Sequence, residues 1–226
     1  MNSFIFFAPM QLTANIQQFI FGATTIQVYV PDAIIMQQWY THMQQQNANA
    51  PSPYWSQVWP AAKALCQFLS NEPHWVNNKT VLELAAGLGL PSMLSAQWAQ
   101  SIICSDYIPE AVEMMRQSIS LMQLKNVEAI VLDWNQLPPT LGTEVLLLSD
   151  INYEPAAFAN ILGVIEQFLQ AGTTILLSTP QRLMAKPFIA QLLPYCILQQ
   201  ETIVTDVTPH VVCSIMVLQK TKAPIG

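Results

Sequence analysis

The sequence predicts an α/β fold: a doubly wound, Rossmann-like sheet with a C-terminal antiparallel β-hairpin and a small N-terminal extension. Three observations lead to this prediction. A buried strand runs into a glycine-rich turn at residues 81–90. Short apolar runs then alternate with helical patterns as far as residue 193, and two further apolar runs close the chain as a hairpin.

The stretch VLELAAGLGL, residues 81–90, is the one around which the chain is organised. Its apolar beginning is typical of a buried parallel strand, and it carries Glu83 before breaking into small residues with Gly87 and Gly89. In a doubly wound sheet, such a turn lies at the carboxyl end of its strand, where glycines let the backbone approach a ligand. Many strand-to-helix turns use glycine for geometry only, and this stretch alone leaves that alternative open. The polar residues after the later strands favour the site of a nucleotide-like cofactor.

The composition is that of a globular chain with an acidic balance. Of the 226 residues, 52% are hydrophobic and 10% are charged, with 8 Lys and Arg against 14 Asp and Glu for a net charge of −6. This balance gives no electrostatic footprint for a nucleic-acid backbone, so we expect no nucleic-acid partner. The sequence has neither a basic leader nor an apolar run of about eighteen residues, which predicts a soluble, cytoplasmic protein without a membrane partner.

The cysteines and histidines indicate no metal site. The cysteines form neither a CxxC pair nor a metal-spaced cluster, and each lies in an apolar run: Cys66, Cys104, Cys196 and Cys213. We expect buried, reduced thiols in a reducing compartment. The histidines are scattered and indicate neither a metal nor a nucleophilic triad: His42, His74 and His210.

Residues 1–50 are predicted to form an N-terminal extension, with residues 51–226 as the main domain. The apolar runs Phe4–Phe7 and Thr25–Val30 indicate a small β element outside the main sheet. Asp32 can cap a helix that continues to about Gln46. The loop QQQNANAPSP then marks the boundary before the main domain.

An aromatic segment, PYWSQVWP, precedes the first helix of the main domain. Pro60 suits the first helical turn, because its missing amide donor costs nothing there. The apolar face of this helix includes Ala61, Leu65, Phe68 and Leu69. From composition alone, Tyr54, Trp55 and Trp59 are a packed lid, with a ligand role as the alternative.

Two further predicted strands end in polar or aromatic residues. The strand Ser101–Cys104 leads to Asp106. The separation between Gly89 and Asp106 is close to the roughly twenty residues at which an acid reaches ribose hydroxyls in nucleotide-binding α/β units. A carboxylate suits that position because it can accept two hydroxyl hydrogen bonds. The strand Val127–Leu132 leads to Asp133 and Trp134, which could bind an adenine amino group and cover its ring face. Helix capping and packing remain the alternatives for these residues.

Helices are predicted at Pro91–Gln100 and at Pro109–Lys125. In the second, four apolar residues recur at helical spacing and are assigned to the core: Val112, Met115, Ile119 and Met122. A fourth strand, Glu144–Leu148, is followed by Asp150 and Tyr153, where a substrate would meet the cofactor. The remaining predicted elements are a helix from Pro155, a strand at Thr173–Leu177, a helix at 181–193, and a hairpin of Ile197–Val204 and Val211–Leu218.

Taken together, these motifs resemble those of the class I, seven-stranded S-adenosylmethionine-dependent methyltransferases. More narrowly, they look like the lysine methyltransferase branch often called methyltransferase family 16, which includes the electron transfer flavoprotein β-subunit lysine methyltransferase. The resemblance covers residues 53–218. Its most specific parts are PYWSQVWPAAKAL, VLELAAGLGLP, CSDYIPEA, LDW and SDINY, the last of which fits the Asp-x-x-Tyr motif of this branch.

The resemblance implies a role for each candidate residue. Glu83, Gly87 and Gly89 would shape the methionine side of the cofactor pocket. The other cofactor-binding residues implied are Asp106 at the ribose, Asp133 and Trp134 at the adenine, and Trp59 packed beside the cofactor. Asp150 and Tyr153 would line the methyl-acceptor site as catalytic residues. Two positions depart from the family pattern: Ala85 stands where the first glycine is usual, and Leu88 where a small polar residue is common.

The resemblance also implies a reaction, the transfer of a methyl group from S-adenosylmethionine to a lysine side chain of a protein substrate. Because a sulfonium is already electrophilic, such an enzyme mainly has to hold a neutral nucleophile in line with the methyl group. We hypothesise that Asp150 hydrogen-bonds the amine and that Tyr153 positions it with its ring face or hydroxyl.

Two other functions fit the same motifs. A small-molecule methyltransferase is the nearest enzymatic alternative, because acceptor identity depends on variable loops and on the N-terminal extension. A non-catalytic module that keeps the fold and binds a protein partner through the aromatic residues is the other. The absence of an Asn-Pro-Pro-Tyr sequence after the fourth strand argues against amide or adenine amino methylation of the familiar kind.

Overall fold

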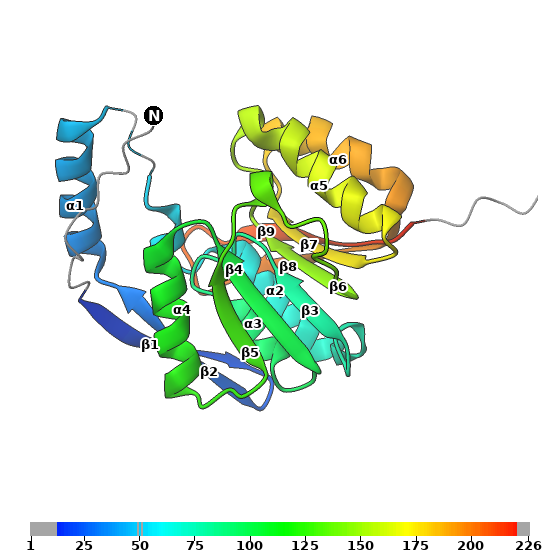
Figure 1. Cartoon of the computed structure of the whole chain (residues 1–226), viewed down its shortest axis with the longest axis horizontal. Coiled ribbons are helices and arrows are strands. Elements are labelled where there is room, and N and C mark those ends of the chain that lie inside the picture. The colour runs from blue at the N-terminus through cyan, green and yellow to red at the C-terminus, as the bar shows by residue number, and fades with distance from the viewer. Residues whose placement is uncertain (1–12, 49, 51, 221–226) are drawn as a thin grey trace, which may run out of the picture.

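The computed structural model describes residues 13–48, 50 and 52–220, and its centre is a seven-stranded sheet in the order β5-β4-β3-β6-β7-β9-β8 (Figure 1). The strands are β3 (Thr80–Glu83), β4 (Ser101–Asp106), β5 (Val127–Val131), β6 (Val145–Ser149), β7 (Thr174–Pro180), β8 (Cys196–Val204) and β9 (Val211–Leu218). The first five are parallel, whereas β9 runs antiparallel to both β7 and β8. The predicted α/β sheet with a C-terminal hairpin is confirmed.

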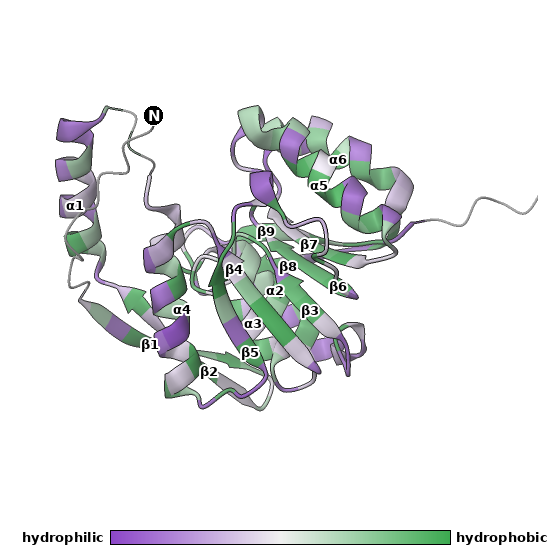
Figure 2. Cartoon of the chain, viewed as in Figure 1, coloured by the Kyte–Doolittle hydropathy of each residue, from purple (hydrophilic) through white to green (hydrophobic). Residues whose placement is uncertain are grey.

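Helices cover both faces of the sheet because successive side chains on each buried strand point to opposite sides. On β3, Val81 belongs to the core shared with α2 (Pro60–Asn71), α3 (Leu90–Ser95) and α4 (Pro109–Leu121). The next residue, Leu82, belongs to the core on the other face, with α5 (Phe158–Gln170) and α6 (Lys186–Leu192). Figure 2 shows the consequence, strands that are hydrophobic along much of their length between helices with mixed faces.

Before the main sheet, the chain forms a two-stranded antiparallel sheet, β1 (Ala14–Phe21) and β2 (Thr24–Pro31), followed by α1 (Ala33–Gln46). The strand predicted at Thr25–Val30 is confirmed, while Phe4–Phe7 lies outside the described residues. Asp32 caps α1 as expected, because its Oδ1 accepts from the backbone N–H groups of Ile34 at 2.9 Å and Ile35 at 3.1 Å. β2 packs on α4, where Ser118 Oγ accepts from the backbone N–H of Tyr29.

Three predicted helices are shorter in the structure. The helix expected at Pro91–Gln100 ends at Ser95, and Asn126 Nδ2 donates to the backbone carbonyls of Ala96 and Ala99. The helix expected to reach Lys125 ends at Leu121, because the chain turns through a left-handed residue, Gln123, with φ 55°. Residues 181–193 hold a 3-10 turn, Leu183–Ala185, before α6.

The core assignments on α4 hold: Val112 and Met115 are fully buried, and Ile119 and Met122 pack against the same core. Within residues 13–48 and 52–220, no helix has the length and apolar character needed to cross a membrane.

Candidate functional site

A cavity of about 750 Å³ lies at the carboxyl edge of the parallel strands. It is lined by the turn after β3, by the residues that follow β4, β6 and β7, and by the aromatic segment that precedes α2. In parallel sheets the strands deliver their following residues to this edge, so side chains far apart in sequence meet there. This cavity therefore contains most of the predicted site residues.

Glu83 supports the cavity without lining it. Its side chain is fully buried, and its Oε2 accepts from the backbone N–H of Ser92 at 3.0 Å and from Ser92 Oγ at 2.5 Å. Burial raises the pKa of Glu83 to about 8, although the two bonds from Ser92 act in the opposite direction. Because Glu83 does not line the cavity, its contribution is to tie the end of β3 to the first turn of α3.

The turn after β3 needs glycine for steric reasons. A Cβ on Gly89, which has φ 71°, would lie 2.7 Å from Cys104 Sγ. A Cβ on Gly87, which has φ 57°, would lie 3.3 Å from the carbonyl oxygen of Trp55. Ala85 also adopts a left-handed conformation, with φ 51°, so the alanine occupies a backbone geometry that glycine prefers. The alanine side chain lies on the cavity wall.

Asp106 joins this turn to the end of β4. Its Oδ2 accepts from the backbone N–H of Gly87 at 2.9 Å, and its Oδ1 accepts from the backbone N–H of Ile108 at 3.0 Å. Burial raises the pKa of Asp106, and the backbone N–H bonds oppose that shift. The carboxyl group lines the cavity, and each oxygen retains a lone pair. It is therefore placed to accept two neighbouring hydroxyl groups while also holding the residue before α4.

Asp133 and Trp134, which come shortly after β5, differ in whether they reach the cavity. Trp134 lines the cavity. Asp133 does not: its Oδ1 accepts from the backbone N–H of Asn135 at 2.9 Å and from Asn135 Nδ2 at 2.8 Å, so that it caps a 3-10 turn. Its Oδ2 has a single, long contact of 3.5 Å from Gln136 Nε2. The structure thus brings only the aromatic member of this pair to the cavity.

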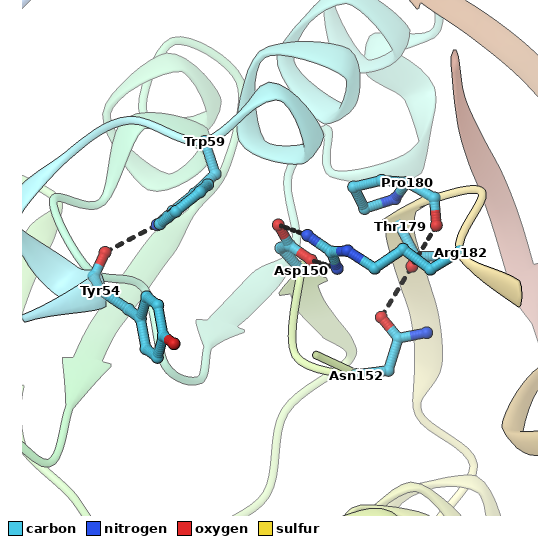
Figure 3. A network of polar contacts seen from close by, with 7 residues as sticks. All are labelled: Tyr54, Trp59, Asp150, Asn152, Thr179, Pro180 and Arg182. Carbon is cyan, nitrogen blue, oxygen red and sulfur yellow. Dashed lines mark hydrogen bonds and ion pairs between the residues drawn. The ribbon is translucent and has the colours of Figure 1, made fainter. Parts of the chain in front are cut away.

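Asp150 is engaged by an arginine that sequence reasoning missed. The Arg182 guanidinium forms a bidentate ion pair with Asp150: Nη1 donates to Oδ1, and Nη2 donates to Oδ2 at 3.0 Å (Figure 3). Asp150 is 6% exposed and has φ 56°, and the ion pair raises the pKa of Arg182. Arg182 comes just after β7 and is the first charged residue beyond that strand, the same signal that identified the acids after the other strands.

Aromatic rings face the ion pair across the cavity. The ring centroids of Tyr54 and Tyr153 are 5.0 Å apart, and those of Tyr54 and Trp59 are 6.0 Å apart. Trp59 Nε1 donates to the carbonyl oxygen of Tyr54 at 2.6 Å, which fixes the indole beside the cavity (Figure 3). Burial raises the pKa of Tyr153 to about 12. The phenol therefore stays protonated near neutral pH and can donate a hydrogen bond.

Within the described part of the chain, His, Cys, Asp and Glu form no group of three or more that could hold a metal ion. The cysteines are all free: Cys66, Cys104 and Cys213 are buried, and Cys196 is partly exposed. The cavity chemistry thus rests on carboxylates, one guanidinium, aromatic rings and a glycine turn.

A family model described as lysine methyltransferase matches residues 41–193. The chain belongs to this family. The match begins within α1 and ends at the residue after α6, so it includes every side chain described above at the cavity.

Curated relatives match over about half of the chain. The histone-arginine methyltransferase METTL23 of Homo sapiens is 33% identical over 117 residues, which is 48% of this chain and 60% of that protein. The electron transfer flavoprotein β-subunit lysine methyltransferase of Danio rerio is 28% identical, covering 58% of this chain and 52% of that protein. The matches thus span only about half to three fifths of these relatives.

Solved structures share the fold. The 16S rRNA N2 G1207 methyltransferase of T. thermophilus, in complex with AdoMet and guanosine, superimposes with a TM-score of 0.63. It is 14% identical, and the alignment covers 95% of this chain and 52% of that one. At this identity the likeness concerns the Rossmann-like architecture alone.

Proposed function

We propose that this chain is an S-adenosylmethionine-dependent methyltransferase that methylates a lysine side chain of a protein substrate. The observation that carries the proposal is a single cavity lined by two acids, Asp106 after β4 and Asp150 after β6, together with aromatic rings. Such a cavity can hold a nucleoside cofactor and an acceptor side by side. Family membership and the names of the relatives support the same chemistry.

The residues present fit this cofactor. Asp106 would accept the two ribose hydroxyls, and Gly87 and Gly89 leave room for the chain that carries the sulfonium. Trp134 would cover the adenine, while Asp133 would reach the adenine amino group only from outside the cavity lining, through Oδ2. Glu83 would act through Ser92 by holding the turn, and Trp59 would pack beside the cofactor.

When bound, the cofactor would supply an electrophilic methyl group: the bond from sulfur to methyl would break as the bond from nitrogen to methyl forms, leaving a thioether, and the methylated nitrogen would lose its extra proton to solvent after the transfer. The protein then has to orient the acceptor and exclude water. Asp150 and Tyr153 would do this as the catalytic residues, the first with a carboxylate oxygen and the second with its ring and hydroxyl. The Tyr54 ring, stacked near Tyr153, completes the wall.

An arginine acceptor is the second candidate. The first curated relatives are named histone-arginine methyltransferases, whereas others are named lysine methyltransferases. In addition, Asp150 already accepts a guanidinium in a two-point geometry, which an arginine substrate could imitate. Small-molecule methylation and non-catalytic partner binding remain alternatives to both.

The experiment is incubation of the purified protein with labelled cofactor and a cell extract, followed by mass spectrometry of the labelled products. Methylated lysine in a protein would support the proposal, and methylated arginine would move it to the second candidate. Label only in small molecules would overturn the protein acceptor. An Asp150→Ala variant separates labelling by this protein from background methyltransferases in the extract.

The proposal extends to the organisation and the cellular setting of the chain. The separate β1–β2 sheet supports residues 1–50 as an extension and 51–226 as the methyltransferase domain. Buried free thiols support a reducing compartment, with the cytoplasm as the proposed location. The net charge of −6 supports a protein rather than a nucleic-acid acceptor.

A further inference from the structure

Asp150 and Arg182 form an ion pair, and both side chains line the cavity. Each oxygen of Asp150 accepts one guanidinium N–H, and the carboxylate is 6% exposed. Arg182 is held in place by its surroundings: its backbone N–H donates to the carbonyl of Pro180. The preceding residue, Gln181, donates its backbone N–H to the carbonyl of Val212 on β9. The pair is therefore built into the end of the sheet.

The pair itself carries no net charge, since one anion is matched by one cation. The other titratable groups around it come from several elements. Cys213 on β9 faces both members, and burial raises its pKa to about 11. Tyr153 is protonated near neutral pH, Glu154 lies at the exposed rim, and Asp106 lies at the ribose end.

We propose that Arg182 is a positioning residue for methyl transfer: by neutralising Asp150, it makes the acceptor end receive an amine in its neutral, nucleophilic form instead of as an ammonium ion. The inference rests on the proposed function. An unpaired, buried Asp150 would stabilise the ammonium, whose nitrogen has no lone pair for transfer. With Arg182 in place, a neutral amine can donate one N–H to Asp150 without retaining the extra proton.

The cofactor itself provides a probe of this charge balance. S-adenosylmethionine and S-adenosylhomocysteine differ by a methyl group and one positive charge at the atom that faces the acceptor. The ratio of their dissociation constants, measured by calorimetry on the purified protein, therefore reports net charge at the acceptor end. No acceptor has to be known for this measurement.

Asp150→Asn is the primary variant, because Arg182 cannot lose its proton and one positive charge remains. Compared with the wild type, we expect this variant to bind S-adenosylhomocysteine more tightly relative to S-adenosylmethionine, by about threefold or more. Arg182→Met should shift it the opposite way at pH 8, and the double variant Asp150→Asn/Arg182→Met should restore the wild-type ratio. The double variant has no unpaired buried charge, so its ratio can still be compared with that of Asp150→Asn where Arg182→Met folds poorly.

Lys186→Met is the matched control, since it removes a cation from the same segment but at an exposed position on α6. Its ratio should equal that of the wild type. An unchanged ratio in Asp150→Asn would overturn the inference, because the pair would then be too remote to govern the acceptor. Failure of the wild-type protein to bind either cofactor would instead overturn the proposed function.

Once an acceptor lysine is known, the pH profile gives a second readout. Arg182→Met should move the acid limb of kcat to higher pH, since more of the bound amine stays protonated. Arg182→Lys should keep the wild-type limb because it retains the charge. A limb that stays in place in Arg182→Met would contradict the inference even if turnover fell.

Discussion

Ser92 donates two hydrogen bonds to one oxygen of Glu83, from its backbone N–H at 3.0 Å and from its Oγ at 2.5 Å. The end of β3 and the start of α3 are thereby joined through a buried carboxyl group, directly below the glycine turn. The other oxygen, Oε1, is buried without a partner. Glu83 is thus a structural support whose protonation state matters to the whole cofactor turn.

The first prediction concerns stability against pH. Since the folded pKa of Glu83 is about 8, above the usual glutamate value of 4.5, the folded state binds its proton more tightly than the unfolded state does. The free energy of unfolding should therefore fall as pH rises from about 4.5 to about 8, and then level off. Urea unfolding of the free protein at several pH values measures this.

Glu83→Gln should flatten that pH dependence, because the group that titrates is gone. Glu166→Gln removes an exposed carboxylate on α5 and is the control. A wild-type slope that persists in Glu83→Gln would assign the effect to another group.

The second prediction uses two glycines with opposite surroundings. Gly89→Ala should lower the free energy of unfolding by about 3 kcal/mol or more, because its Cβ would meet Cys104 Sγ and its φ is 71°. Gly163→Ala, in α5 with no atom within 4 Å of the new Cβ, should be neutral or stabilising by about 0.5 to 1 kcal/mol. Equal effects at both positions would refute the steric account of the turn.

The third prediction concerns Ala85, which holds a left-handed conformation that glycine adopts at no steric cost. Ala85→Gly should keep the free energy of unfolding within about 1 kcal/mol of the wild type, since relief of strain offsets the greater freedom of the unfolded chain. Ala85→Val should destabilise by more than that. Thermal unfolding curves of the two variants distinguish the effects, and a stable Val variant would contradict the left-handed geometry.

The fourth prediction concerns Tyr153. Because its pKa is about 12, the phenol should not act as a base, and Tyr153→Phe should leave the shape of the pH profile of methyl transfer unchanged. Removing the hydroxyl should slow transfer by about tenfold, the effect of one lost hydrogen bond, whereas Tyr153→Ala should cost more because the ring beside Tyr54 is also lost. Loss of the basic limb in Tyr153→Phe would be the contrary result.

Much of the fold followed from sequence because the signals are local. Asp32 before a helix and a strand running into Gly87 and Gly89 each report on a few neighbouring residues. The rule that parallel strands deliver their following residues to one edge then correctly placed Asp106, Trp134 and Asp150 at one cavity.

What the sequence could not predict depends on tertiary contacts. The early end of α3 depends on Asn126, thirty residues from Ala96, and the fork of Arg182 onto Asp150 joins two strand ends. Asp133 followed the same strand-end rule as Asp106, but its side chain turns back to Asn135 because that bond is local. A pattern gives the position of such a residue and not the direction of its side chain.

The central claim, a cofactor site built on Asp106, is tested most directly by calorimetric titration of S-adenosylmethionine and S-adenosylhomocysteine into the wild-type protein, Asp106→Ala and Asp106→Asn. We expect wild-type dissociation constants on the order of micromolar, weakened about 100-fold or more in Asp106→Ala, which loses both hydrogen bonds to the carboxylate, and by less in Asp106→Asn, whose amide oxygen still accepts. Glu110→Ala, a nearby exposed acid in the first turn of α4, should bind as the wild type does. Two results would contradict the account. One is a wild-type protein, freed of copurified cofactor and shown by urea titration to be folded, that binds neither compound. The other is an Asp106→Ala variant that binds both compounds as the wild type does.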